Sequence, residues 1–184
     1  MVTLVELIYK LRSPDNKRVL QAVEELRVRG WLQDGSLKGV PLCHVHMQGV
    51  DLLSADLSNI DFHQANFENA DLSMANLTNT KLTRVNFQRA NLSHADITGA
   101  DLYKANLKEA RNLTDEQLKK AKRLYGAIMP DGETYNGRFN LEGDLAFARW
   151  GRVDTENSQA MADFYGITLE TYMRGQNTLE SSLA

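Results

Sequence analysis

The sequence of 184 residues contains only one cysteine, three prolines and no excess of basic residues. The single Cys43 cannot form a disulfide within the chain, which suits a reducing cytoplasm. The 21 Lys and Arg residues against 24 Asp and Glu leave a net charge of −3, which disfavours direct binding to nucleic acid. No apolar run approaches the roughly 18 residues of a membrane-spanning helix. We expect no secretory signal either, because Glu6 lies near the N-terminus and no basic segment precedes an apolar run.

The motifs of common catalytic and cofactor-binding classes are also missing. The sequence has no phosphate-binding loop, no GxGxxG, no GxSxG nucleophile elbow, no HExxH and no CxxC pair. We therefore expect a protein that is not an enzyme and that holds no cofactor.

A repeat with a period of five residues occupies the middle of the chain. Every fifth residue from position 37 to position 107 is large and apolar. A second column, from position 40 to position 110, lies two residues before the next large residue and holds nine Ala, four Val, one Ile and one Thr. The position between these columns is mostly Asp or Asn from 51 to 106. Three columns this regular indicate a repeat architecture.

The period of five predicts a chain that coils around an axis. The small and large columns are two residues apart, as they would be on one face of a strand, but the phase resets every five residues. A corner must therefore intervene in each unit. With four corners per coil, residues 20 apart stack about 4.8 Å from one another, and the fifteen units make roughly four coils. The Ala and Leu columns then point inward, where one residue per side must be small.

Residues 55–59 (Ala-Asp-Leu-Ser-Asn) and 75–79 (Ala-Asn-Leu-Thr-Asn) resemble the A(D/N)Lxx unit of the pentapeptide-repeat family. The resemblance covers about residues 35–111. It implies a mainly β fold, a right-handed quadrilateral β-helix that forms a solenoid. The family contains many bacterial proteins and is abundant in cyanobacteria, so the resemblance implies a chain of this bacterial type. Its best-understood members bind DNA gyrase as mimics of DNA.

A few residues depart from the motif: Pro41, His46 and Lys81 in the Asp/Asn column and Thr80 in the Ala column. The departure at Lys81 agrees with four-sided stacking, because Lys81 lies 20 residues after Asp61 and 20 before Asp101. The predicted column is then Asp, Lys, Asp, which avoids three stacked carboxylates. The remaining Asp and Asn side chains are expected to hydrogen-bond the local backbone at corners.

Residues 1–34 are predicted to form a helical N-terminal cap, because a stack of coils exposes an apolar end and unpaired edges. Thr3 and Glu6 form a capping-box pattern that opens a helix to about Arg12. Ser13 and Pro14 then resemble an N-cap and a first helical residue for a second helix. This segment also resembles a HEAT-type helix, but one helix pair is too short for an independent solenoid.

The C-terminal third is predicted to be helical. In residues 112–136 a second capping box, Thr114 to Gln117, predicts a helix to about Leu124, followed by a turn. Residues 137–184 form a helical C-terminal extension with three short helices near residues 141–150, 158–165 and 169–173. About forty residues are too few to fold alone with confidence, so these helices should pack on the coils or on a partner.

Cys43, His44 and His63 share one predicted corner. Cysteine and histidine are good ligands of Zn²⁺. We nevertheless expect a solvated corner rather than a metal site, because exposed corners of a coil carry polar side chains without a ligand.

One side of the predicted coils carries larger outward residues than the others. His63, Arg84, Tyr103 and Lys104 lie on it, and aromatic and arginine side chains are frequent anchors of interfaces. This side is the predicted partner-binding side. The resulting hypothesis is a cytoplasmic, non-enzymatic scaffold for an unknown protein partner, with no direct role for nucleic acid or membrane and either a monomeric or a homodimeric state.

The alternative hypothesis is a DNA mimic that binds gyrase. Such a mimic requires an acidic rod that copies phosphate charge. Residues 35–111 carry eight acidic and seven basic residues, whereas residues 112–184 carry eleven and eight. The nearly neutral repeat disfavours mimicry.

Overall fold

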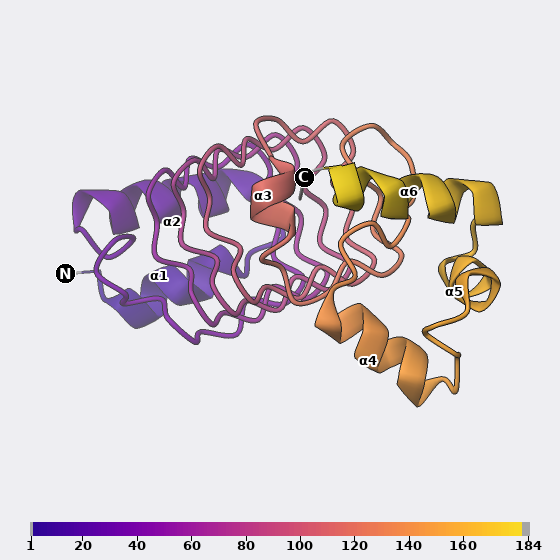
Figure 1. Cartoon of the computed structure of the whole chain (residues 1–184). Helices are drawn as coiled ribbons and strands as arrows, with labels where there is room; N and C mark the ends of the chain where they lie inside the picture. The colour runs from indigo at the N-terminus through magenta and orange to yellow at the C-terminus, as the bar shows by residue number, and fades with distance from the viewer. Residues whose placement is uncertain (1, 182–184) are drawn as a thin grey trace.

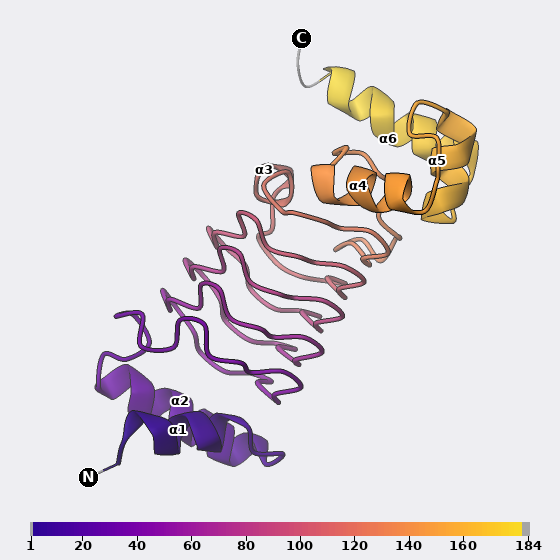
Figure 2. The same ribbon diagram turned by 90° about the horizontal axis from the view of Figure 1, so that it is seen from below.

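The computed structural model describes residues 2–181 as a stack of coils with helices at both ends (Figures 1 and 2). Helices α1 (Leu4–Leu11) and α2 (Asn16–Val28) lie side by side at one end of the stack. Helices α4 (Glu142–Trp150), α5 (Ser158–Tyr165) and α6 (Leu169–Ser181) lie at the other end. None of the helices in residues 2–181 is both long and apolar enough to cross a membrane.

The coils are joined by isolated parallel bridges between residues 20 apart, from Pro41 with Asp61 to Asn91 with Arg111. A bridge recurs every five residues and a turn follows each one, so one coil has four sides. In residues 2–181 these contacts are single bridges rather than extended strands. The reason is the repeat itself, because a chain that turns every five residues leaves only about one residue per side for pairing with both neighbours.

The interior is built from the two apolar columns that the sequence predicts. The large residues from Leu37 to Leu107 are at most 3% exposed. Phe67 and Phe87, 20 residues apart, stack with ring centres 5.4 Å apart. Thr80, the polar member of the small column, is 1% exposed, and its hydroxyl donates to the carbonyl oxygen of Leu77 at 2.6 Å. A buried hydroxyl with an acceptor carries little penalty, so this departure from the motif is tolerated.

The Asp and Asn column forms the corners, as predicted. Eleven of these side chains accept a hydrogen bond from the main-chain N–H two residues later; the acceptors are Asp51, Asp56, Asp61, Asn66, Asp71, Asn76, Asn86, Asn91, Asp96, Asp101 and Asn106. In addition, Asn76 Nδ2 donates to Asp56 Oδ1 of the preceding coil at 3.1 Å. Each corner is therefore held within its own side and, in several columns, to the next coil.

The predicted column of Asp61, Lys81 and Asp101 is confirmed. Bridges join Asp61 to Lys81 and Lys81 to Asp101, and Lys81 Nζ lies 3.3 Å from Asp61 Oδ2. Asp101 pairs instead with Arg123 of the last coil at 2.6 Å. Opposite charges thus alternate from Asp61 to Arg123.

The helix expected from Thr114 to about Leu124 is shorter than predicted. Helix α3 is a single turn, Asp115–Leu118, and the coil resumes after it. Bridges then join Asp101 to Arg123 and Asn106 to Ile128, a spacing of 22 instead of 20. This continuation was not predicted, because α3 inserts two residues and shifts the phase of the repeat. The renewed spacing of five between Leu124 and Met129, both buried, is the pattern that could have revealed it.

Two other helix boundaries differ from expectation. The N-cap of α2 is Asp15, whose side chain accepts from the N–H of Lys17, whereas Ser13 accepts from the N–H of Asp15. Pro14 therefore precedes helix α2 and is not its first residue. Helix α6 continues to Ser181, beyond the expected end near Met173.

The open edges of the first and last coils are covered by side chains of opposite character. At the first coil, Arg12 Nη2 donates to the carbonyl oxygen of Pro41 at 2.8 Å and Asn16 Nδ2 donates to that of Gln48 at 3.0 Å. At the last coil, the carboxylate of Asp144 in α4 accepts main-chain N–H groups. These side chains satisfy edge groups that would otherwise remain unpaired.

Candidate functional site

The four residues of the predicted partner-binding side lie along one corner of successive coils. His63 and Tyr103 occupy the first turn position, and Arg84 and Lys104 occupy the second, with φ of +56° and +54°. The N–H of Arg84 donates to the carbonyl oxygen of Tyr103 at 2.8 Å, which fixes the vertical spacing of this corner. The stacked backbone therefore presents these side chains from a fixed frame.

Tyr103 does not lie free on the surface. Its ring stacks on that of Tyr125, with centres 5.8 Å apart, and meets the ring of Phe147 of α4 edge-on at 5.8 Å. The guanidinium of Arg123 lies 4.6 Å from the centre of the Tyr103 ring. Tyr103 is consequently half-buried and joins the last coil to α4, so its accessible part is smaller than the sequence suggests.

Arg84 and Lys104 are exposed and have no ion-pair partner among residues 2–181. The ammonium of Lys104 lies 5.3 Å from the Tyr103 ring, and its side chain runs over Gly126 of the next coil. Two unpaired cations therefore stand on the corner beside α4.

Trp150 extends this surface at the C-terminal end of α4. It is 81% exposed, and its ring is parallel to that of Phe147, with centres 6.0 Å apart. Phe147 in turn contacts Tyr103. We call the set Arg84, Tyr103, Lys104, Phe147 and Trp150 the cationic-aromatic surface. Phe147 and Trp150 fall within the helix expected near residues 141–150, but no periodicity could show which side of the coils this helix covers.

The corner with Cys43 and the two histidines is brought together as predicted from the stacking. The rings of His44 and His63 are perpendicular, with centres 5.7 Å apart. The Cys43 thiol lies 3.7 Å from the carbonyl oxygen of Asp61, and burial raises the pKa of this thiol, as does the side chain of Asp61. A raised pKa disfavours the thiolate that a metal site needs. In the described part of the chain, no group of three or more His, Cys, Asp or Glu residues is arranged to hold a metal ion.

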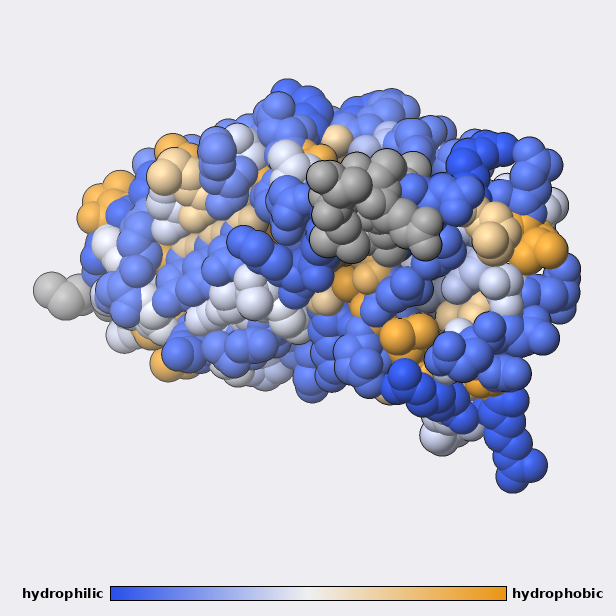
Figure 3. Space-filling view, in the orientation of Figure 1, coloured by the Kyte–Doolittle hydropathy of each residue, from blue (hydrophilic) through white to orange (hydrophobic). Residues whose placement is uncertain are grey.

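The space-filling view is mostly hydrophilic, with apolar areas where α1 and α2 lie and where α4 to α6 lie (Figure 3). At the first of these areas Val5 and Tyr9 of α1 are 75% and 79% exposed. Among the described residues, Trp150 of α4 is the most exposed large apolar residue, at 81%. Only the second area adjoins residues of the predicted partner-binding side.

A stack of five-residue sides with an apolar axis and Asp or Asn at its corners defines a class of repeat protein. Eight copies of the pentapeptide repeat are matched within residues 36–73, 46–84 and 70–108. This part of the chain belongs to the pentapeptide-repeat family. No curated protein matches the sequence.

Several solved structures are similar to the chain. A pentapeptide repeat protein from the thylakoid lumen of Arabidopsis thaliana is 26% identical, with a TM-score of 0.26; the match covers 52% of this chain and 65% of that one, just under two thirds of its length. The pentapeptide repeat protein Rfr23 from the cyanobacterium Cyanothece 51142 is 24% identical over 57% of this chain and 89% of that one, with a TM-score of 0.23. QnrB1, a plasmid-mediated fluoroquinolone resistance protein, is 15% identical over 62% and 90%, with a TM-score of 0.18. Scores this low support no conclusion about activity.

Proposed function

We propose that the protein is a non-enzymatic, cytoplasmic scaffold that binds a protein partner through the cationic-aromatic surface. In this proposal the repeats form a right-handed quadrilateral β-helix, α1 and α2 form its N-terminal cap, and α4 to α6 form an extension. Support comes from the bridges between residues 20 apart and from the helices that meet both open edges. Such a frame holds surface side chains at a fixed spacing, which lowers the ordering cost of binding.

The observation that carries the proposal is the row of aromatic rings that joins the exposed Trp150, through Phe147, to Tyr103 and the unpaired cation of Lys104. An 81% exposed tryptophan and two exposed cations without ion partners contribute little to the stability of the fold, since they bury little area and form no ion pair. Tryptophan and arginine are the residues most enriched among energetic hot spots of interfaces. Phe147 and Tyr103 connect Trp150 to the coil, because the Trp150 ring stacks on Phe147 and Phe147 contacts Tyr103.

The chemistry of this surface indicates the partner. Arg84 and Lys104 favour carboxylate groups, and Trp150 offers a flat apolar face at the other end of the row of rings. A partner segment with acidic residues flanking an apolar side chain fits both features.

The test is affinity capture from cells of the source organism with the full chain. We expect a partner that the wild-type protein retains and that Arg84→Ala/Lys104→Ala loses by about tenfold or more, as the loss of two charge contacts predicts. Trp150→Ala should lose the same partner. Deletion of residues 137–184 is a poorer test, because it removes Asp144 and leaves the last coil uncovered.

The matched control is Lys108→Ala/Arg111→Ala, which removes two exposed cations on another side of the coils. This variant should retain the partner. Equal capture by the wild type and all three variants would exclude the cationic-aromatic surface as the binding site.

A further inference from the structure

The ladder of coils is interrupted beside α3. Three columns of bridges continue into the last coil, and their final members are Arg111, Arg123 and Ile128. The fourth column joins Asp56, Asn76 and Asp96, and the described residues contain no bridge beyond Asp96. Helix α3 bulges outward at this place, so one side of the last coil is missing.

The gap leaves two main-chain donors without an acceptor. In the coil below, the N–H groups of Met74 and Leu77 donate to carbonyl oxygens of the next coil at 2.8 Å. The equivalent groups belong to His94 and Ile97, and no acceptor for either is found in residues 2–181. Both N–H groups therefore point along the stack toward the space that the missing side would fill.

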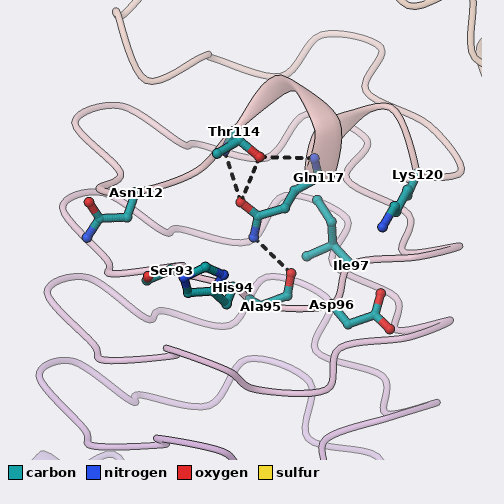
Figure 4. A pocket seen from close by; sticks show the side chains of 9 residues that line it. All are labelled: Ser93, His94, Ala95, Asp96, Ile97, Asn112, Thr114, Gln117 and Lys120. Atoms are coloured by element: carbon teal, nitrogen blue, oxygen red, sulfur yellow. Dashed lines mark hydrogen bonds between the residues drawn. The ribbon is translucent and has the colours of Figure 1, made fainter.

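The carbonyl oxygens at the same corner are already satisfied. Gln117 Nε2 of α3 donates to the carbonyl oxygens of Leu92 and Ala95, each at 2.9 Å. Figure 4 shows the bond to Ala95 and the one that Gln117 Oε1 accepts from the N–H of Thr114. The Gln117 amide thus replaces the donor that a further coil would bring to Ala95. The main-chain groups that remain without a partner at this corner are therefore the N–H groups of His94 and Ile97.

A hollow of about 740 Å³ opens onto these donors, and its lining includes His94, Ile97 and Lys120 (Figure 4). Lys120 is exposed and has no ion-pair partner in the described part of the chain. Asp96 also lines the hollow, but Oδ1 of its carboxylate accepts from the N–H and the hydroxyl of Thr98. Hydrogen bonds from Thr98 and the nearby charge of Lys120 lower the pKa of Asp96, so Lys120 already acts on one carboxylate of the hollow. The hollow therefore combines two free N–H donors with a cation that forms no direct ion pair, and these groups can bind a carboxylate.

The same edge of the coils is closed elsewhere by a carboxylate. Leu124 occupies in the last coil the position that Ile97 occupies beside α3, and Asp144 Oδ1 and Oδ2 each lie 3.2 Å from its main-chain nitrogen. Oδ1 of the same carboxylate accepts from Tyr125 at 2.9 Å. An edge N–H of this ladder is thus satisfied by an acidic side chain when no further coil follows.

We propose that the hollow beside α3 binds a carboxylate carried by an extended segment of a partner protein. The carboxylate accepts from the N–H group of Ile97, a main-chain carbonyl oxygen of the same segment accepts from that of His94, and Lys120 pairs with the negative charge. The segment lies where the missing side of the coil would lie. This site is separate from the cationic-aromatic surface, so either one can fail without the other.

The test uses the full chain labelled with ¹⁵N and follows the amide resonances during titration. The probe is a short peptide with blocked ends, Gly-Glu-Gly, and the matched control is Gly-Gln-Gly with the same blocking groups. We expect the amide protons of His94 and Ile97 to move downfield with the glutamate peptide and to stay in place with the glutamine peptide. Lys120→Ala should weaken binding about threefold, the size expected for one exposed charge pair, whereas Lys108→Ala should leave it unchanged.

Three results would overturn the proposal. The first is the absence of any shift at these two amides up to saturating peptide. The second is an equal shift with the glutamine peptide, which would show that binding in the hollow does not require a negative charge. The third is a titration with sodium acetate that matches the peptide, which would assign the hollow to free carboxylates instead of a partner segment.

Discussion

The carboxylate of Asp144 accepts the main-chain N–H of Leu124 through both oxygens, each 3.2 Å from the nitrogen. This contact joins α4 to the open edge of the last coil. Because Asp144 is completely buried, the contact places an ionisable group inside the junction between the coils and the C-terminal helices. The stability of the protein should therefore depend on the protonation of one side chain.

The first prediction concerns pH. Burial raises the pKa of Asp144 to about 6, although the hydrogen bonds from Leu124 and Tyr125 lower it. The unfolded value is roughly 3.9, so the folded protein binds this proton more tightly than the unfolded chain does. The contribution of Asp144 to the free energy of unfolding should therefore fall as pH rises from about 4 to above 6, by roughly 2–3 kcal/mol.

Urea unfolding of the wild type and of Asp144→Asn between pH 4 and pH 8 measures this effect. The amide of Asn can still accept an N–H but does not titrate, so the variant should lack this part of the pH dependence. All other ionisable side chains are the same in both proteins, so their contributions cancel in the difference. Identical pH profiles would show that Asp144 keeps an ordinary pKa.

The second prediction concerns the close approach of α4 to the last coil. A Cβ added to Gly143 would collide with the main-chain carbonyl oxygen of Lys122, which cannot move without displacing the coil. Gly143→Ala should destabilise the protein by roughly 1–3 kcal/mol through this overlap. The higher helix propensity of Ala, about 1 kcal/mol, offsets part of that loss.

Gly151→Ala is the control for Gly143→Ala. Its added Cβ would meet its nearest neighbour, the carbonyl oxygen of Ala148, at 3.4 Å, an ordinary contact. Chemical unfolding monitored by circular dichroism should separate the two variants. Equal stabilities would mean that α4 is not held against the coil at Gly143.

The third prediction concerns the Asp/Asn column. Lys81 lies exposed in that column and forms an ion pair with Asp61. Lys81→Asn would restore a corner hydrogen bond to the N–H of Thr83 and a contact with Asp61 like the 3.1 Å bond from Asn76 to Asp56. An exposed ion pair contributes at most about 1 kcal/mol, and two hydrogen bonds contribute about as much or more.

Lys81→Asn should therefore be at least as stable as the wild type and about 1 kcal/mol more stable than Lys81→Ala, which keeps neither contact. Thermal and urea unfolding of the three proteins give the comparison. If the Asn and Ala variants unfold at the same denaturant concentration, the corner hydrogen bonds contribute nothing measurable.

The fourth prediction concerns DNA gyrase. Residues 35–111 have eight acidic against seven basic residues, and Arg84 and Lys104 stand exposed without ion partners. A surface of this kind does not copy the continuous negative charge of DNA. We expect no inhibition of gyrase supercoiling, and no protection of gyrase from a fluoroquinolone, at micromolar protein.

The control for the gyrase assay is Arg84→Glu/Lys104→Glu, which makes the same corner acidic. Inhibition by the wild-type protein would contradict the prediction. Inhibition by the acidic variant alone would show that charge, and not shape, separates this chain from a DNA mimic.

The sequence by itself determined the coils. A five-residue period repeated without interruption places residues 20 apart above one another, and each Asp or Asn side chain bonds the backbone two residues later. For this reason the column of Asp61, Lys81 and Asp101 could be predicted from spacing alone. The corner hydrogen bond is local and the stacking is periodic, so the geometry of one five-residue unit predicts that of the other units.

Only the tertiary structure decided how the coils end and what covers them. The two residues that α3 inserts break the period, so the return of the coil at Arg123 and the gap at Asp96 lay outside the pattern. The packing of Phe147 on Tyr103 and of Asp144 on Leu124 joins segments 44 and 20 residues apart with no common repeat. Such contacts depend on the shapes and charges of particular side chains in three dimensions, and the periodic pattern of the sequence does not predict them.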